Sequence, residues 1–396
     1  MHDNHETKMQ ILLERGVENI FPSRDFLEEK LKSGKPLTIY CGYDPTGPTL
    51  HIGHAITLMK LRDFQELGHK VMLLIGDFTA LIGDPTDKSA ARVRQTREQV
   101  LENCKLYKQQ AMAILNFEGE NPAELKFNND WLGKLSFVEV IELASHFTVQ
   151  QMLERDMFEK RMQEEKPIYL HEFLYPLMQG YDSVAMDVDG EVGGNDQTFN
   201  MLAGRDLIKD LKGREKFVVA TKLLTDSSGK KMGKSEGNMI ALSDTPEDMF
   251  GKVMRWTDDM ILRGFEICTR VPMEEIREIE DAMKNGANPR DFKLNLAYHV
   301  TQMFLGDEAA RQGRDYFATV IQSSEKPAEI AELKPTTYDI LTVLVEAKFV
   351  DSRGEARRQI EGGGVKINDE KVESIEAEVK PGDIIQKGKR FFVKIV

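Results

Sequence analysis

Cysteine is scarce in this sequence: Cys41, Cys104 and Cys268 are the only three in 396 residues. Their number and wide separation predict neither a disulfide framework nor the paired spacing of a zinc site. No run of about 18 apolar residues occurs, which argues against a transmembrane helix, and the polar first residues lack the apolar centre of a secretory signal. We therefore expect a cytoplasmic protein. We interpret Cys41 as a small buried strand residue rather than a nucleophile, because no histidine base is specified nearby.

Positive charge is also in deficit, since 53 Lys and Arg face 66 Asp and Glu for a net charge of −13. A protein that binds nucleic acid over its whole surface would be basic instead. Residues 338–396 carry 11 basic and 11 acidic side chains, so the whole negative excess belongs to residues 1–337. Any contact with a polyanion should therefore use a local patch, and the C-terminal segment is the least repulsive place for one.

The composition that remains, 41% hydrophobic and 30% charged, is typical of a soluble globular protein, and the length allows two or three domains. Residues 37–41 read as a strand, 55–67 have helical spacing that stops at Gly68, and 70–76 read as a second, buried strand. Such a β-α-β unit implies a parallel sheet. The sequence thus predicts an α/β, Rossmann-like first domain.

The next hundred residues show little strand character and predict a helical insertion at about residues 90–170. Helical spacing fits residues 96–115, 137–145, 149–163 and 170–180. Strands are expected again at 183–188 and within 216–224, and residues 245–324 read as helical throughout. A polar, proline-containing stretch follows at 325–335. We expect a catalytic domain over residues 1–235, an α-helical domain over 236–324, a linker over 325–337 and a small α+β domain over 338–396.

The C-terminal segment offers the candidate nucleic-acid surface. Arg353, Arg357 and Arg358 are expected on one helix, Lys366 lies in the following glycine-rich stretch, and more basic residues precede the last strand. Such charges can also form an ordinary solvated face. Their contrast with the acidic remainder favours a contact with RNA or DNA.

The stretch around His51 combines a strand, a glycine- and proline-rich turn and a helix start. Helix N-termini present unpaired N–H groups that suit a phosphate. His51 and His54 are three residues apart and share one helix face, and Gly53 removes a side chain between them. Taken alone, the pair is equally compatible with two histidines that cap a helix.

Four loops are expected at one edge of the sheet, where ligands bind in open α/β folds. They are residues 40–54, 77–88, 193–197 and 230–235. The motif His51-Ile-Gly-His54, followed by Lys231-Met-Gly-Lys234-Ser, resembles the HIGH and KMSKS signatures of the class I aminoacyl-tRNA synthetases. Gly233 departs from the second signature but leaves both lysines in place.

Further stretches narrow the resemblance to the tyrosyl-tRNA synthetases of bacterial type, from about Ile11 to the end of the chain. They are Tyr40-Cys-Gly-Tyr-Asp-Pro-Thr46, Leu81-Ile-Gly-Asp-Pro85, Tyr175-Pro-Leu-Met-Gln-Gly-Tyr-Asp182 and Gly193-Gly-Asn-Asp-Gln197. The terminal segment looks like an RNA-binding domain first described in a ribosomal protein. Tryptophanyl-tRNA synthetases, the sister family, normally lack it.

The resemblance implies a ligase that activates L-tyrosine with ATP and transfers the tyrosyl group to tRNA(Tyr). It places the phenol of tyrosine on Tyr40 and Asp182, and the α-ammonium group on Asp84, Tyr175 and Gln179. Gln197 would contact the carboxyl side. The adenylate would lie along Gly42, Asp44 and Gly53, with its ribose on Gly194 and Asp196. The catalytic set would be His51, His54 and Thr46 on the phosphates and Lys231 and Lys234 over the departing pyrophosphate, with Lys234 also binding ATP.

The resemblance also implies partners and a metal. Mg²⁺ would accompany ATP, the only cofactor, with no prosthetic group and no dedicated protein cage. Lys88 and Arg92 are further candidate pyrophosphate contacts. Family members are homodimers built through the helical insertion, and the apolar run 137–143 is the candidate contact here, though it fits a core helix equally well.

Two alternatives stay open. The first is the tryptophan enzyme, against which Tyr40, Asp182 and the terminal domain argue. The second is a synthetase-like RNA-binding protein that has lost catalysis, against which the intact histidine and lysine motifs argue.

Overall fold

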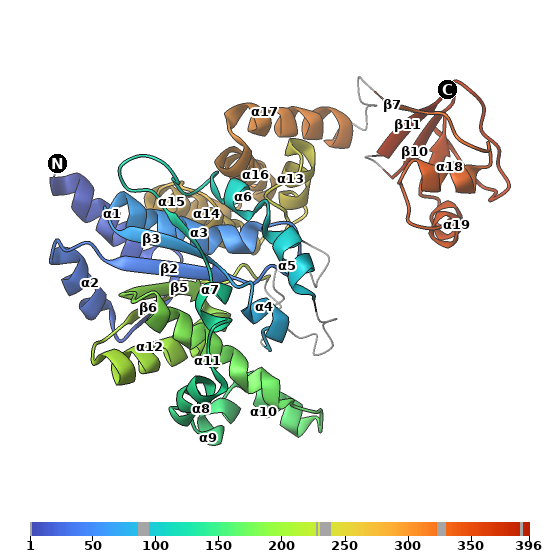
Figure 1. Ribbon diagram of the computed structural model, residues 1–396. Coiled ribbons are helices and arrows are strands. Elements are labelled where there is room, and N and C mark those ends of the chain that lie inside the picture. Colours follow the sequence, from blue (N-terminus) through green and yellow to red (C-terminus); the bar gives the residue numbers. More distant parts are fainter. Residues whose placement is uncertain (1, 86–94, 227–228, 230–238, 323–329, 389–390) are drawn as a thin grey trace.

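The computed structural model describes residues 2–85, 95–226, 229, 239–322, 330–388 and 391–396. Four residues with an expected role, Lys88, Arg92, Lys231 and Lys234, lie outside the described residues. Figure 1 shows a large body and, beside it, a smaller C-terminal unit.

A six-stranded sheet forms the centre of the body (Figure 1). Its strands are β1 (Val17–Phe21), β2 (Thr38–Tyr43), β3 (Lys70–Ile75), β4 (Glu124–Phe127), β5 (Gly190–Gly194) and β6 (Phe217–Thr221). Their order in space is β1-β6-β5-β2-β3-β4, and only the edge strand β1 runs antiparallel to its neighbour. The expected α/β parallel sheet is confirmed.

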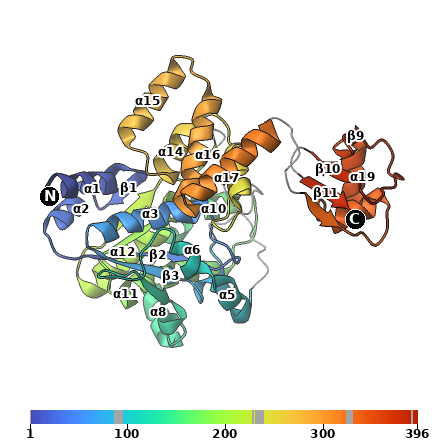
Figure 2. The same ribbon diagram turned by 90° about the horizontal axis from the view of Figure 1, so that it is seen from above.

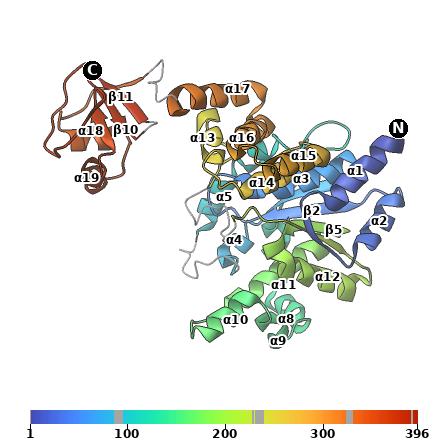
Figure 3. The ribbon, with the colours of Figure 1, turned by 180° about the vertical axis from the view of Figure 1, so that it is seen from behind.

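Helices cover both faces of this sheet. The N-terminal part contains α1 (His2–Glu14), α2 (Arg24–Lys32), α3 (Ile52–Glu66), α4 (Thr79–Ile82), α5 (Arg97–Cys104), α6 (Tyr107–Ala111), α7 (Asn129–Leu132), α8 (Phe137–Ser145), α9 (Val149–Leu153), α10 (Asp156–Gln163), α11 (Leu170–Ala185) and α12 (Thr198–Lys212). Figures 1 and 3 show α1 and α3 over one face and α11 and α12 over the other. Because side chains alternate along a strand, Ile39 and Cys41 join the core beneath α3 while Tyr40 points to the opposite face.

Several expected elements differ from those observed. Residues 183–188 are not a strand: α11 continues to Ala185, a turn with Asp187 at φ 52° ends it, and pairing with β2 begins when Asp189 N–H donates to Thr38 O at 2.9 Å. The expected helices 96–115 and 149–163 are each broken into two, α5 with α6 and α9 with α10. Periodicity alone does not reveal such breaks, because the apolar spacing continues across them.

The insertion also contains a strand that the sequence did not predict. Residues 124–127 form β4, which extends the sheet beyond β3 in parallel pairing. Its four residues are too short for a clear alternation pattern, and an edge strand needs only one partner.

Residues 245–322 are helical, as expected. The helices are α13 (Pro246–Val253), α14 (Met260–Cys268), α15 (Met273–Lys284), α16 (Pro289–Leu305) and α17 (Asp307–Tyr316), followed by one π-helical segment (Phe317–Gln322). Figure 2 shows them stacked beside α3. Among the described residues no helix is long and apolar enough to cross a membrane.

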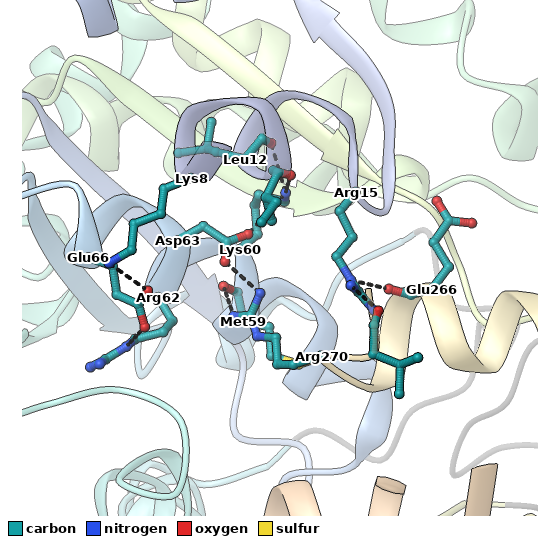
Figure 4. A network of polar contacts seen from close by, with 12 residues as sticks. Lys8, Leu12, Arg15, Met59, Lys60, Arg62, Asp63, Glu66, Glu266 and Arg270 are labelled. Carbon is teal, nitrogen blue, oxygen red and sulfur yellow. Dashed lines mark hydrogen bonds and ion pairs between the residues drawn. The ribbon is translucent and has the colours of Figure 1, made fainter. Parts of the chain in front are cut away.

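A partly buried cluster of charges, the helix junction, joins α1, α3 and α14 (Figure 4). We define it as Arg15, Lys60, Asp63, Glu266 and Arg270. The Arg15 guanidinium donates to the backbone oxygens of residues 265, 266 and 271 at 2.7–2.8 Å, where α14 ends. Asp63 accepts from Arg270 at 2.6 Å and pairs with Lys60 at 3.2 Å, while Lys60 also donates to the Leu12 carbonyl at 2.8 Å. The helical segment is thereby held against the sheet domain.

The C-terminal unit has its own sheet and core. Its elements are β7 (Ala331–Leu333), α18 (Ile340–Glu346), α19 (Arg353–Glu361), β8 (Val365–Ile367), β9 (Glu370–Lys371), β10 (Ile384–Lys387) and β11 (Phe391–Ile395). The strand order is β7-β11-β10-β8-β9. Ile340, Leu344, Ile360 and Ile385 are among its buried residues. The expected linker 325–337 needs correction, because residues 331–333 pair in parallel with β11, and backbone pairing of so short a segment leaves no side-chain pattern to read.

Candidate active site

A cavity of about 630 Å³ opens beyond the carboxyl ends of β2, β3 and β5. It is lined by every described residue that was expected to bind tyrosine or ATP or to act in catalysis. These are Tyr40, Gly42, Asp44, Thr46, His51, Gly53, His54, Asp84, Tyr175, Gln179, Asp182, Gly194, Asp196 and Gln197. The parallel sheet brings these residues together because its strands deliver their following loops to one edge.

The two histidines form the N-terminal cap of α3. Nδ1 of His51 accepts the Gly53 N–H at 3.1 Å, and Nδ1 of His54 accepts the His51 N–H at 3.0 Å. Their rings stack with centroids 3.8 Å apart. Helix capping, the alternative considered for this pair, is therefore correct: one nitrogen of each ring accepts a backbone hydrogen bond at the start of α3.

Capping also determines the protonation of the second ring nitrogen, Nε2, of each histidine. A ring nitrogen that accepts an N–H carries no proton, so each neutral ring is protonated at Nε2 and presents a donor there. Burial, followed by the neighbouring His51, lowers the pKa of His54 and keeps that ring neutral. Two Nε2–H donors at a helix N-terminus suit an anionic group.

Gly53 is required by this arrangement. A Cβ at that position would lie 2.9 Å from Cε1 of His51, so the space left by the glycine is used by the histidine ring rather than reserved for a ligand ring. The chain that follows the lysine motif returns here: Ile52 N–H donates to Ile240 O and Leu242 N–H to Leu50 O, both at 2.9 Å. The start of α3 and residues 240–242 are therefore neighbours.

Asp182 lies at the buried end of the cavity and has two neutral donors. Trp131 Nε1 donates at 2.7 Å and Asn128 Nδ2 at 3.2 Å. Burial raises the pKa of the Asp182 carboxyl well above its ordinary value, and the hydrogen bonds from Trp131 and Asn128 partly offset that rise. This carboxylate is suited to accept a further hydrogen bond from a polar group of a ligand.

Asp44 is held between two hydroxyl groups. Thr79 Oγ1 donates to its Oδ1 at 2.6 Å and the Tyr175 hydroxyl to its Oδ2 at 2.9 Å. Gly76 makes room for it, since a Cβ there would lie 2.0 Å from Asp44 Oδ1. The structure thus links Tyr175, expected at the ammonium group of tyrosine, with Asp44, expected at the adenylate.

Asp84 and Gln197 meet across the cavity mouth. Gln197 Nε2 donates to Asp84 Oδ2 at 2.7 Å, and Arg155 lies 3.9 Å from the other carboxylate oxygen. Gln179, in turn, donates through Nε2 to Glu191 Oε1 at 3.1 Å, which leaves its amide oxygen as an acceptor for a cation.

Sequence reasoning missed several residues that shape the site. Trp131 and Asn128 support Asp182, and a buried set beneath the cavity joins Tyr40 to Lys216. We define the cavity floor as Tyr40, Asp182, Ser183, Glu191 and Lys216. Glu191, for which no role in the site was expected, lies in β5. A lysine and a glutamate in a polar stretch look like surface residues, so no local signal marked them.

The basic residues expected to bind RNA lie on two elements of the C-terminal unit. Arg353, Arg357 and Arg358 lie on α19 as expected, and Lys366 lies on β8; all four are exposed. Arg353 pairs with Asp339 at 3.0 Å and also donates to Thr342, so part of its role is to tie α19 to α18.

The helical insertion exposes a large apolar face. On α8, Phe137 is 79% and Val138 72% exposed, and at the start of α11 Leu170 is 84% exposed. Only Leu143 of α8 is buried.

Among the described residues no group of three or more His, Cys, Asp or Glu could hold a metal ion.

Comparison with known proteins agrees with this geometry. Residues 32–322 match the family of class I tRNA synthetases (W and Y), and residues 340–385 match the S4 domain. A tyrosine–tRNA ligase from Moorella thermoacetica is 43% identical over 97% of this chain and 94% of its own length. One from Carboxydothermus hydrogenoformans is 44% identical over 99% and 98%.

Solved structures are similar as well. A C-terminally truncated mitochondrial tyrosyl-tRNA synthetase from Coccidioides posadasii is 28% identical, with a TM-score of 0.63, over 78% of this chain and 91% of its own. A tyrosyl-tRNA synthetase from Archaeoglobus fulgidus, complexed with L-tyrosine, has a TM-score of 0.61 at 22% identity over 78% and 99%. The latter likeness concerns the fold.

Proposed function

This chain belongs to the class I tRNA synthetases of the tryptophan and tyrosine group and is a tyrosine–tRNA ligase; on that premise we propose how its residues divide the work. The enzyme joins tyrosine to ATP, releases pyrophosphate and passes the tyrosyl group to the 3′ end of tRNA. The attacking amino-acid carboxylate is already an anion, so the first step needs no general base. Positioning and stabilisation of charge carry the reaction.

Tyrosine occupies the acidic end of the cavity. Its phenol lies between Tyr40 and Asp182, and its ammonium group is bound by Asp84, Tyr175 and Gln179. The support for the second assignment is that Gln179 is held by Glu191 with its amide oxygen left to accept. The carboxyl group of tyrosine points toward Gln197.

ATP occupies the end nearest α3. Gly42, Asp44 and Gly53 border its adenylate, and Gly194 and Asp196 bind the ribose. Thr46 and the Nε2–H groups of His51 and His54 face the phosphates, which the capping pattern supports because it orients both donors. Lys231 and Lys234, outside the described residues, close on the pyrophosphate. Mg²⁺ enters with ATP as part of the substrate.

The observation that carries this assignment is the gathering of the expected residues around one cavity. Amino-acid-dependent ATP–pyrophosphate exchange tests it with tyrosine, tryptophan and phenylalanine offered separately. We expect exchange with tyrosine and little with the other two. Silence with all three, in folded protein, would contradict the assignment, and exchange with tryptophan alone would contradict the specificity.

The domains divide activation from tRNA binding. Residues 1–235 carry the catalytic domain, 236–324 a helical domain toward the anticodon, and 338–396 a domain that binds RNA through Arg353, Arg357, Arg358 and Lys366. Because β7 belongs to the C-terminal sheet, a truncation should end at Gln322 rather than within residues 331–333. It should keep pyrophosphate exchange and lose most tRNA charging. Equal loss of both activities would refute this division.

The enzyme works as a homodimer in the cytoplasm, where tRNA is charged. The exposed apolar face of α8 supports the contact, because large apolar patches usually mark an interface. Phe137→Asp should shift the mass measured by light scattering from dimer to monomer. Leu211→Asp, at another exposed apolar residue, is the matched control and should not. A wild-type chain that is monomeric at micromolar concentration would rule the dimer out.

A further inference from the structure

The cavity floor contains a buried lysine that neither the family motifs nor the assignments above use. We propose that Lys216 is a positioning residue for tyrosine recognition: through Ser183 it orients the hydroxyl of Tyr40, so that this hydroxyl donates to the phenol oxygen of the substrate. The inference rests on the proposed placement of the tyrosine phenol between Tyr40 and Asp182.

Strand register brings Lys216 beneath the cavity. Tyr40 of β2 is the partner of Glu191 in β5, and Glu191 is the partner of Val218 in β6. Lys216 lies two residues before Val218, and side chains two apart along a strand share a face. All three polar side chains therefore point to the side covered by α11 and α12.

The contacts of Lys216 are short and entirely internal. Nζ donates to Ser183 Oγ at 2.7 Å and to the Met201 carbonyl at 3.2 Å, and it pairs with Glu191. The Tyr40 ring centroid lies 5.7 Å from Nζ. The Lys216 side chain is 0% exposed, so its ammonium group does not contact bulk solvent.

The direction of the hydrogen bonds follows from the chemistry of an ammonium group. Lysine has three donors and no acceptor, so Ser183 Oγ accepts from Lys216. The Ser183 hydroxyl also lies 3.0 Å from the Tyr40 hydroxyl, and no other acceptor for it is found among the described residues. Ser183 thus donates to Tyr40, and the Tyr40 proton is left for Glu191, whose hydrogen bond also raises the pKa of this hydroxyl, or for the phenol oxygen of the substrate.

Glu191 makes the ammonium group necessary. This carboxylate lies close enough to Tyr40 that, after burial, its charge is the main cause that raises the pKa of the tyrosine hydroxyl. Glu191 also accepts a hydrogen bond from the Tyr40 hydroxyl and so competes with the substrate for that proton, and it would compete more strongly if it were unpaired. Pairing with Lys216, together with the bond from Gln179, occupies Glu191.

The helices that cover the floor are shaped around this lysine. A Cβ at Gly204 of α12 would lie 2.7 Å from both Lys216 Nζ and Ser183 Oγ. Gly180 of α11 faces the same contact, with Gly204 N 3.2 Å from the position of its absent Cβ. Gly204 therefore leaves room for the buried ammonium group, and Gly180 allows α12 to approach α11 closely.

The expected donor chain runs in one direction, from Lys216 through Ser183 and Tyr40 to the phenol oxygen of tyrosine, whose own proton goes to Asp182. Phenylalanine cannot complete it. Losing Lys216 should therefore weaken the binding of tyrosine much more than the binding of phenylalanine.

Steady-state pyrophosphate exchange with Lys216→Met tests this role, with Ser183→Ala as a second variant that keeps the Lys216–Glu191 pair. Both should raise KM for tyrosine about tenfold, change kcat little, and leave the parameters for phenylalanine unchanged. In Lys216→Met the loss of tyrosine binding on acidification should also begin at a higher pH than in wild type, because Asp182 and Glu191 then share a buried site with no cation.

The matched control is Lys60→Met, which removes another buried lysine that is paired with a carboxylate but lies in the helix junction. It should lower stability without changing the preference for tyrosine over phenylalanine. If Lys216→Met does not fold, Lys216→Met/Glu191→Gln removes the uncompensated charge and carries the same expectation for KM and for phenylalanine, but not the shift in pH dependence.

The inference is overturned if folded Lys216 variants and Ser183→Ala keep the wild-type preference for tyrosine. Tyr40→Phe separates this failure from failure of the proposed phenol site. If Tyr40→Phe loses the preference and the other variants keep it, only the role of Lys216 is wrong. If Tyr40→Phe keeps it, the phenol site itself is misplaced and the inference fails with it.

Discussion

The helix junction and the cavity floor both bury charged side chains, but they balance them differently. In the helix junction Asp63 meets two cations, Lys60 at 3.2 Å and Arg270 at 2.6 Å. On the cavity floor Asp182 meets two neutral donors, from Trp131 and Asn128. The junction is electrostatically complete without a ligand, whereas the floor keeps a carboxylate whose best remaining partner is a ligand hydroxyl.

The difference indicates what each network contributes. The junction holds α1, α3 and α14 in one arrangement, so its charges act on stability. The floor retains a desolvated charge at a cost in stability, because burial raises the pKa of Asp182, and that cost is offset when tyrosine binds. The same chemistry therefore acts on folding in one place and on recognition in the other.

Asp63→Asn should have the largest effect on stability. It leaves the buried Lys60 ammonium group without its carboxylate, and breaking a buried ion pair in this way costs about 3–5 kcal/mol. Urea denaturation monitored by circular dichroism measures the loss. KM for tyrosine should stay at its wild-type value in the folded enzyme. A loss below about 1 kcal/mol would mean that the junction is not a network of mutually dependent charges.

Asp182→Asn should show the opposite behaviour. Tyrosine binding should weaken by about 1–3 kcal/mol, which is about five- to 160-fold, because an acceptor for the phenol is lost. The free energy of unfolding should fall far less than in Asp63→Asn, since an amide in that position is buried without a charge. Equilibrium tyrosine binding and urea denaturation on the same samples give both values. Equal destabilisation in the two variants would erase the contrast between the regions.

The pH dependence of tyrosine binding should follow Asp182. Its folded pKa is raised, so as the pH falls through that value the carboxyl gains a proton and no longer accepts the phenol hydrogen. Affinity should fall by up to about tenfold per pH unit below it. The sign for stability is opposite: the folded state holds the proton more tightly, so the free energy of unfolding due to Asp182 decreases as pH rises from the unfolded pKa, about 3.9, to the folded one.

Asp182→Asn is the control for this titration and should flatten both pH profiles. A wild-type affinity that rises on acidification would contradict the assignment of an ionised acceptor.

Lys8→Ala should have the smallest effect. Lys8 and Glu66 lie 3.5 Å apart at the edge of the helix junction, with both side chains 39% exposed. Such a pair contributes less than about 1 kcal/mol. Urea denaturation should barely distinguish this variant from wild type. If the free energy of unfolding fell as much as in Asp63→Asn, the exposed pair at the edge of the junction would stabilise the fold as much as the buried pair at its centre.

The fold followed well from the sequence where local patterns were strong. The strand–loop–helix unit around His51, the strand at 70–75 and the helix at 137–145 were predicted nearly to the residue. Prediction failed at 183–188, because α11 continues to Ala185 and a turn with Asp187 at φ 52° follows it. It also failed at β4 and β7, which are short edge strands that exist because a partner strand is beside them.

The candidate site divides in the same way. The spacing of His51 and His54 predicted a shared helix face at a helix start, and the resemblance implied their role at the phosphates. Asp182 and Gln179 were identified from the resemblance, but their partners Trp131 and Glu191 were not.

By itself, the sequence determined the periodicity of the helices and strands, the helix start at His51 with its two histidines, and the acidic body with a charge-neutral C-terminal segment. These depend on residues that are close along the chain. Only the tertiary structure decided that Lys216 would be buried against Glu191 and Ser183, because that contact requires the register of β2, β5 and β6 and the close approach of α11 and α12 at Gly204. The sequence shows that residue 216 carries a positive charge. Only the folded chain shows which carboxylate and which hydroxyl that charge contacts.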